Sequence, residues 1–154
     1  MLTIIGCGNA NCSDDAAGII VAQQLQSYLF QNPKENVKIF DAGTSGMDVM
    51  FMARGSSELI IIDASSTNSE PGAIYEVPGE ELENLPEPSF NLHDFRWDNA
   101  LYAGRKIFKD DFPESVTVYL IEAGNLDLGM SLSESVIPSV DSVTVKIKDI
   151  IDSY

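Results

Sequence analysis

The sequence is 154 residues long with 44% hydrophobic and 21% charged residues, a composition typical of neither a disordered chain nor a membrane protein. Its 24 acidic and 9 basic residues give a formal net charge of −15, which excludes binding to nucleic acid through phosphate contacts. The charge suits a partner with a basic surface, and solubility alone explains it equally well. We expect one domain over residues 1–154.

The chain starts with a short apolar run, residues 2–6 (LTIIG), that leads directly into a glycine turn and has no basic region before it. This pattern predicts a buried first strand and not a signal peptide. Other apolar runs, such as 59–62, are far shorter than the roughly 20 residues that span a bilayer. Cys7 and Cys12 are poorly spaced for a structural disulfide and lack CxxC spacing, so we expect reduced thiols in a cytoplasmic protein.

Helical and strand patterns alternate along the rest of the chain. Residues 14–30 carry apolar side chains at helical spacing, with Ser13 as the expected N-cap and Asp14 and Asp15 in the first turn. Residues 58–63 (ELIIID) are apolar on both faces, as in a central parallel strand. The other expected elements are strands at 37–41, 73–78 and 115–122, helices at about 45–54, 92–109 and 133–152, and loops at 64–72, 80–90 and 124–132.

The order of these elements predicts an α/β fold: a three-layer sandwich with a mostly parallel twisted sheet of about five strands and helices on both faces. Pro78 favours an edge position for the strand at 73–78, because proline cannot donate to a ladder. In such folds ligand sites lie beyond the carboxyl ends of the strands. This rule places the turn at 6–15, the turn at 41–46 and Asp63 in one neighbourhood.

The turn Gly6-Cys7-Gly8-Asn9 has two of the three glycines of a dinucleotide-binding loop, but Asn11 stands in the third position. The acidic pair Asp14 and Asp15 then follows, where a bound pyrophosphate would need positive potential. The sequence therefore disfavours nucleotide binding. For either aspartate alone helix capping is the simpler role, and one of them can cap while the other faces the site.

Asp63 and His93 are the other candidate site residues. Asp63 ends an apolar strand, where a carboxylate either binds loop amides or presents a ligand or base. His93 is the single histidine and begins a predicted helix, a place more typical of surface or capping residues. If the fold brings His93 to Asp15 and Asp63, the two carboxylates and the imidazole are suitable ligands for a borderline divalent metal.

Nucleophilic chemistry is less favoured. A cysteine paired with the histidine would lie among carboxylates, which raise the pKa of a thiol and suppress the thiolate. No GxSxG elbow is present to support a serine nucleophile. Adjacent aspartates in a helix point about 100° apart, so Asp14 and Asp15 cannot form an aspartic dyad.

Four segments in chain order resemble the nickel-iron hydrogenase maturation endopeptidases. They match the family's GxGN turn with an acidic pair, its DGGT-x-G-M motif, its strand-end aspartate and its histidine at the head of a helix. The segments are GCGNANCSDDAAG (6–18), DAGTSGM (41–47), LIIIDAS (59–65) and NLHDF (91–95). Two positions differ from the common pattern: Asp15 stands where the family often has glutamate, and Ala42 replaces a glycine and restricts the backbone there.

The resemblance implies a cytoplasmic, metal-dependent, aspartic-type peptidase that removes the C-terminal extension of the nickel-loaded precursor of a NiFe-hydrogenase large subunit. It implies that the precursor presents the nickel and that Asp15, Asp63 and His93 contact the metal and serve catalysis. Asp41 and Thr44 are assigned to substrate positioning. We expect a monomer that binds neither nucleic acid nor membrane.

Two other functions stay open at this point. Because Asp15 is shorter than the glutamate common in the family, the chain could instead be a non-catalytic protein that recognises a metal-loaded partner. A small-molecule hydrolase is the third alternative.

Overall fold

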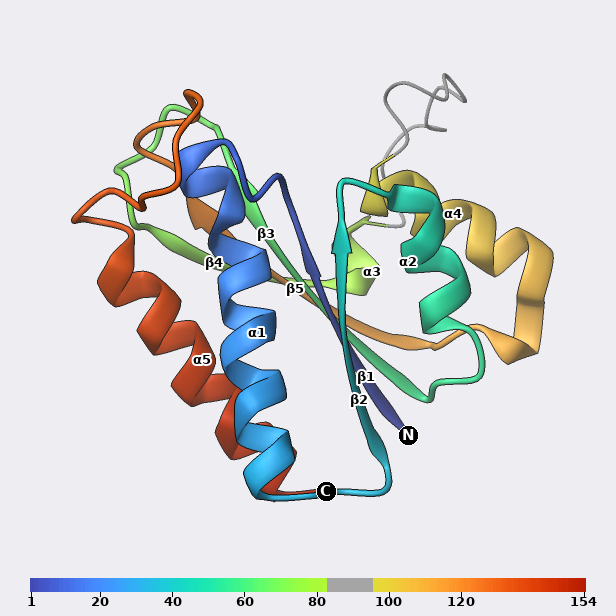
Figure 1. Ribbon diagram of the computed structural model, residues 1–154. Helices are drawn as coiled ribbons and strands as arrows, with labels where there is room; N and C mark the ends of the chain where they lie inside the picture. The colour runs from blue at the N-terminus through green and yellow to red at the C-terminus, as the bar shows by residue number, and fades with distance from the viewer. Residues whose placement is uncertain (83–95) are drawn as a thin grey trace.

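The computed structural model of the chain describes residues 1–82 and 96–154 (Figure 1). Within these residues five strands form one sheet in the order β2-β1-β3-β5-β4. Four are parallel and β4 pairs antiparallel with β5 at the edge, which confirms the predicted α/β class and the edge position of the Pro78 strand. The strands are β1 (Leu2–Cys7), β2 (Val37–Gly43), β3 (Glu58–Ser65), β4 (Ile74–Pro78) and β5 (Ser115–Glu122).

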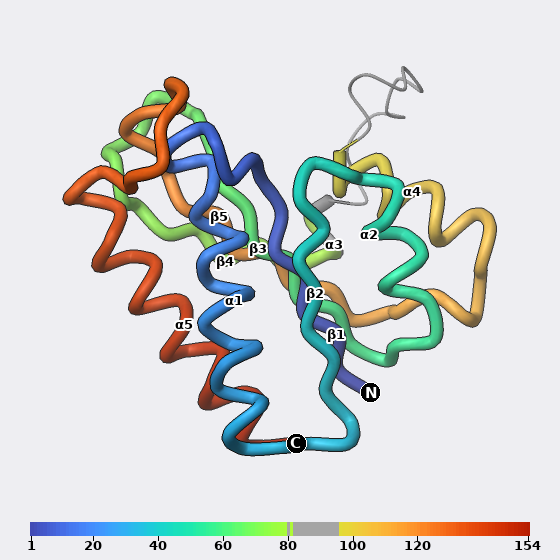
Figure 2. The backbone as a smooth tube through the Cα atoms, viewed as in Figure 1, coloured from blue at the N-terminus to red at the C-terminus, as the bar shows by residue number. Residues whose placement is uncertain are grey.

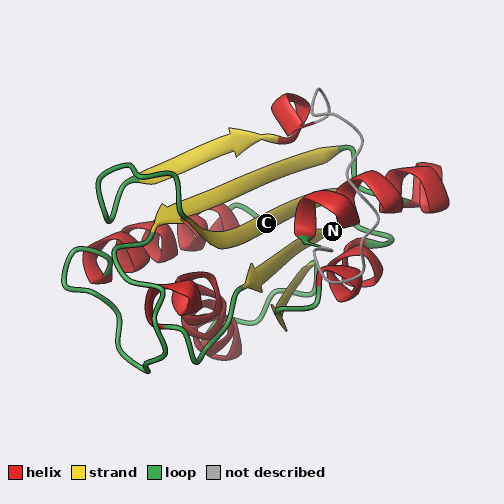
Figure 3. Ribbon diagram, turned by 90° about the horizontal axis from the view of Figure 1, so that it is seen from above, coloured by secondary structure: helices red, strands yellow, loops and turns green. Residues whose placement is uncertain are grey.

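Helices cover both faces of the sheet, as predicted (Figures 1 and 3). Figure 2 shows α1 (Ala17–Gln31) and α5 (Ile137–Asp152) side by side on one face, while α2 (Gly46–Ala53) and α4 (Trp97–Phe108) cover the other. In the described part of the chain the short helical turns are η1 (Ser13–Ala16), α3 (Gly79–Leu82) and η3 (Lys109–Asp111). Within the described part of the chain, no helix is both long and apolar enough to cross a bilayer.

The central strand β3 is buried on both faces because alternate side chains enter two separate cores. Ile60 and Ile62 pack in the core beneath α1 and α5. Leu59 and Ile61 pack in the core beneath α2 and α4. The continuous apolar run that precedes Asp63 therefore follows from the position of this strand in the middle of the sheet.

Helix α1 lies in backbone contact with the two central strands, and two glycines make this possible. A Cβ atom at Gly18 would lie 2.2 Å from the carbonyl oxygen of Ile62 and 2.6 Å from that of Cys7. A Cβ atom at Gly6 would lie 2.3 Å from the carbonyl oxygen of Gly18. The start of α1 is thereby fixed directly above the carboxyl ends of β1 and β3.

The predicted helix at 14–30 is wrong at its start. Residues 13–16 form the separate turn η1, and Ala16, which makes no side-chain cap, precedes α1. Ser13 is not the N-cap: it has a φ of 51°, and its hydroxyl donates to the carbonyl oxygen of Asp127 at 2.8 Å. Contacts with a loop distant in sequence replace the local capping geometry that the sequence indicated.

Other boundaries also differ. The last helix begins at Ile137 and not at 133, because the N–H of Ser133 is bonded to Asp14 and Pro138 occupies the first helical turn. The expected loop at 80–90 is interrupted by α3 over residues 79–82. The expected helix at 92–109 is described from Trp97, and its first residues lie outside the described part.

We predict that Gly18→Ala lowers the free energy of unfolding by more than about 2 kcal/mol, because the added methyl group meets backbone atoms that cannot move aside. Chemical denaturation measures the loss. Gln23→Ala, on the exposed face of the same helix, is the control and should change stability by less than about 0.5 kcal/mol. Equal stability of the two variants would contradict the close contact between α1 and the sheet.

Candidate functional site

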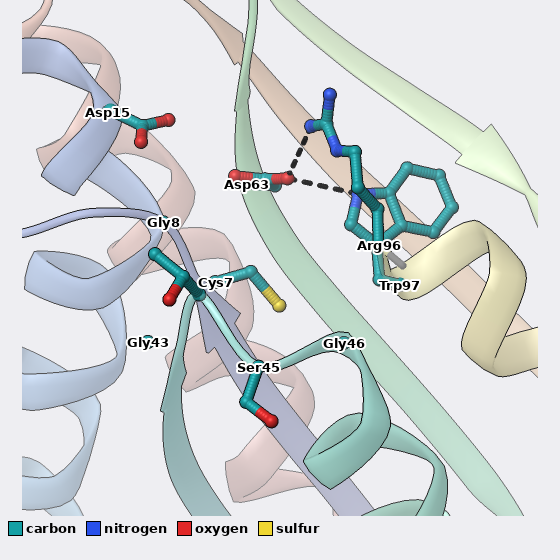
Figure 4. Close-up of a pocket in the computed structure, with 10 residues that line it drawn as sticks. Cys7, Gly8, Asp15, Gly43, Ser45, Gly46, Asp63, Arg96 and Trp97 are labelled. Atoms are coloured by element: carbon teal, nitrogen blue, oxygen red, sulfur yellow. Dashed lines mark hydrogen bonds and ion pairs between the residues drawn. The ribbon is translucent and has the colours of Figure 1, made fainter. Parts of the chain in front are cut away.

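A cavity of about 240 Å³ lies at the carboxyl edge of the parallel strands (Figure 4). Its walls come from the turn after β1, the turn after β2, the end of β3 and the start of α4. The N–H of Gly8 donates to the carbonyl oxygen of Gly43 at 2.9 Å and joins the two turns. The lining residues are Cys7, Gly8, Asp15, Gly43, Thr44, Ser45, Gly46, Asp63, Arg96 and Trp97.

Asp15 reaches this cavity because the chain folds back tightly after β1. Gly8 has a φ of 138°, which side chains of L-residues rarely permit, and a Cβ atom there would lie 1.8 Å from the carbonyl oxygen of Asp15. One carboxylate oxygen of Asp15 accepts the backbone N–H of Asn9 at 2.9 Å. The glycine turn thus holds the Asp15 carboxylate, half-buried, on the cavity wall.

Asp14 has the opposite role although it is the adjacent residue. Its buried carboxylate accepts the N–H groups of Gly124 and Asn125 at 2.8 Å each, and the N–H and hydroxyl of Ser133 at 2.7 Å each. Burial by itself would raise the pKa of Asp14, but these hydrogen bonds outweigh it and hold the pKa below its ordinary value. Asp14 therefore anchors the loop between β5 and α5.

Asp63 lies deep in the cavity, with only 4% of its surface exposed. Its Oδ2 accepts hydrogen bonds from the Arg96 guanidinium at 3.1 Å and from the Trp97 indole N–H at 3.0 Å (Figure 4). Its Oδ1 accepts the N–H of Ala64 at 2.8 Å. Burial raises the pKa of Asp63, the Asp15 charge adds to this, and the Arg96 charge opposes it.

The sequence interpretation missed Arg96 and Trp97. Both follow the predicted histidine motif directly, and Trp97 is the only tryptophan in the chain. A buried indole N–H needs an acceptor, so the single tryptophan was a weak signal that a polar acceptor lies near the start of this helix. The arginine beside it had no signal of its own.

Cys7 is buried on the cavity wall and is not a suitable nucleophile. Burial, followed by the charge of Asp63, raises the pKa of its thiol far above the ordinary range. The charge of Arg96 opposes this with a smaller effect, and Asp41 adds a still smaller increase. The thiol is therefore protonated at neutral pH. This agrees with the expectation of a reduced, unreactive cysteine at this position.

From the turn after β2, Thr44 is exposed and lines the cavity. Asp41 does not line it. The Asp41 carboxylate accepts the N–H of Gly43 at 2.9 Å and so stabilises the turn itself. The positive φ of this turn, 53°, falls on Gly43 and not on Ala42. The alanine at 42 is therefore accommodated without the backbone strain that its replacement of a glycine suggested.

The third predicted ligand, His93, lies outside the described residues. Over residues 1–82 and 96–154, no three histidine, cysteine, aspartate or glutamate side chains are grouped closely enough to hold a metal ion. The described cavity offers two carboxylates, Asp15 and Asp63, with a guanidinium beside the deeper one. Their roles as metal contacts and catalytic groups stay predictions.

Comparison with known proteins identifies likenesses to one family. A family model described as hydrogenase maturation protease matches residues 19–150. A protein of Methanocaldococcus jannaschii, provisionally named a hydrogenase maturation protease, is 33% identical over 94 residues, which are 60% of this chain and 59% of that relative. The chain thus spans less than two thirds of that relative's length.

A sequence match and a structural match, both from Escherichia coli, extend the likeness. The hydrogenase 2 maturation protease is 28% identical over 137 residues, covering 88% of this chain and 80% of that protein. The solved structure of the hydrogenase maturating endopeptidase HybD matches 99% of this chain and 92% of its own, with a TM-score of 0.81 and 22% identity. The structural match establishes a shared fold.

We predict that Asp14→Asn lowers the free energy of unfolding at pH 7 by about 2 kcal/mol or more, because an amide cannot accept all four hydrogen bonds. The same change at the neighbouring Asp15 is the control and should cost less than about 1 kcal/mol, since an amide oxygen can still accept the N–H of Asn9.

The stability difference between wild type and Asp14→Asn should also depend on pH. Because the folded-state pKa of Asp14 is lowered, its contribution is complete above the unfolded pKa of about 3.9 and is lost as the pH falls through the folded value. Urea titrations at several pH values between 7 and 3 measure the difference. A gap that stays constant with pH would contradict the ionised anchor.

We further predict that native protein treated with iodoacetamide at pH 7.5 is modified at Cys12, which is half-exposed, while Cys7 reacts at least about tenfold more slowly. Peptide mass mapping measures both sites, and equal labelling in urea serves as the control. Rapid native labelling of Cys7 would show a reactive thiol in the cavity.

Proposed function

The chain belongs to the hydrogenase maturation protease family, and we therefore propose that it is an endopeptidase that removes the C-terminal extension of the nickel-loaded precursor of a NiFe-hydrogenase large subunit. The nickel belongs to the substrate and is not a resident cofactor. Asp15, Asp63 and His93 contact this nickel, and Thr44 contacts the peptide that carries it. Asp41 acts on substrate position through the turn that it stabilises.

One observation carries the proposal: two carboxylates, from the turn after β1 and from the end of β3, line one cavity. Asp15 and Asp63 are 48 positions apart in the sequence, and the parallel sheet brings them to the same edge. Among the described residues that line the cavity, two carboxylates stand against one cation, Arg96. Such a cavity favours a bound cation.

The ligand chemistry is consistent with a metal that the substrate presents. Thiolates of the precursor supply soft ligands that favour nickel over harder ions, and the peptidase adds carboxylate and imidazole ligands. A bound metal can polarise a carbonyl group or generate a nucleophilic water. The residues of this chain then orient the metal-bearing segment and hold negative charge beside it.

The properties of the whole chain agree with this proposal. The formal net charge of −15 favours an encounter with a basic surface on the precursor. We propose that the protein acts as a monomer in the cytoplasm. The protonated state of Cys7 argues against a thiol mechanism.

The test is cleavage of purified precursor, followed by gel shift, with and without bound nickel. Wild-type protein should cut only the loaded form. Asp15→Asn, Asp63→Asn and His93→Ala should each lower turnover by about two orders of magnitude or more, because each removes a group that contacts the metal. Asp15→Glu should retain activity, since it keeps the charge and restores the commoner residue of the family.

Cys7→Ala and Cys12→Ala are the matched controls and should still cleave, apart from any packing loss at the buried Cys7. Full cleavage of nickel-free precursor would contradict metal recognition. Binding of the loaded precursor without any cleavage would instead favour the non-catalytic binding protein.

A further inference from the structure

The ion pair between Arg96 and Asp63 joins two groups with very different surroundings. The Asp63 side chain is 6% exposed, whereas the Arg96 side chain is 64% exposed. An ionised carboxylate in such a place needs a positive partner, but the guanidinium is already well solvated and gains little from the pair. The ion pair therefore stabilises the charged form of Asp63 much more than it stabilises Arg96.

Arg96 also lies beside the carboxylate oxygens that a metal ion would bind. An ionised carboxylate oxygen has two lone pairs, and on Oδ2 of Asp63 these are taken by Arg96 and Trp97. Oδ1 already accepts the N–H of Ala64, so one lone pair remains there. A divalent ion bound to either oxygen would lie within a few ångströms of the guanidinium and would be repelled by it.

We propose that Arg96 is an exchangeable counter-ion that neutralises Asp63 in the free protein and leaves when a metal-bearing substrate enters the cavity. This inference rests on the proposed function, because it gives the Asp63 carboxylate a cationic substrate. Free divalent ions must compete with Arg96 and bind weakly. A nickel ion delivered with its peptide brings additional contacts and can displace the guanidinium.

Trp97 keeps the carboxylate oriented during this exchange. Its side chain is buried, and its indole N–H donates to the same oxygen as Arg96. When the arginine leaves, Asp63 retains two fixed hydrogen bonds, from Trp97 and from Ala64. The site is thus preorganised for a metal while its charge is balanced by a group that can be replaced.

The experiment titrates the full-length protein with nickel(II) chloride in the absence of precursor. Trp97 is the only tryptophan and contacts Asp63, so quenching of its fluorescence by the paramagnetic ion reports binding at this carboxylate. Arg96→Met keeps an apolar stem and removes the charge, and it should bind nickel about tenfold more tightly than wild type. Arg96→Lys keeps the charge and should stay within about twofold of wild type.

Two controls separate this effect from a change of net charge. Arg54→Met also removes one positive charge, from a surface pair with Asp111, and should leave the affinity unchanged. Asp63→Asn combined with Arg96→Met should abolish the gain. Affinity of Arg96→Met equal to or weaker than that of wild type, or absence of nickel binding in both proteins, would overturn the proposal.

The nickel titration is independent of cleavage. A tighter-binding Arg96→Met protein together with no cleavage by wild type would leave the counter-ion role standing and reject the proposed peptidase function. Cleavage of loaded precursor by wild type, without any change of nickel affinity in Arg96→Met, would reject the counter-ion role and leave the proposed peptidase function standing.

Discussion

The backbone contact between α1 and the central strands sets the geometry of the whole carboxyl edge. Gly6 and Gly18 allow the helix to rest on the ends of β1 and β3 without an intervening side chain. The short turn η1 must then lie directly over the edge of the sheet, and it carries the two adjacent aspartates with it. A helix held farther away by side chains would not place Asp15 beside the end of β3. The cavity thus depends on a packing contact that contributes no functional group.

Carboxylates at this edge differ in function because their surroundings differ. Asp14 is saturated with hydrogen bonds and is buried, so it holds a loop. Glu122, at the end of β5, does the same for the loop after β3: it accepts hydrogen bonds from Ser65, Thr67 and Ser69, and these hold its pKa below the ordinary value despite burial. Asp15 and Asp63 instead line the cavity, and Asp63 is paired there with Arg96. Buried carboxylates thus anchor two loops at this edge of the sheet, whereas the carboxylates of the cavity hold no loop distant in sequence.

The class of fold and the meeting of the turn after β1 with Asp63 at one edge follow from the order of amino acids alone. The continuous apolar run of ELIIID requires a central strand, and the succession of strands and helices requires a mostly parallel sheet. Because parallel strands end at the same edge, this succession is enough to place the turn after β1 and Asp63 together. These inferences succeed since they depend on local periodicity and on general rules of chain connection.

The packing of the layers settles which of the adjacent aspartates faces the cavity and what balances the charge of Asp63. The hydrogen-bond partners of Asp14 lie 110 to 119 positions away in the sequence, and Arg96 lies 33 positions from its partner. No local pattern encodes such contacts, so Ser13 looked like a helix cap and Arg96 carried no recognisable signal. The roles of polar side chains depend on which distant donors reach them, and that is fixed when the layers pack.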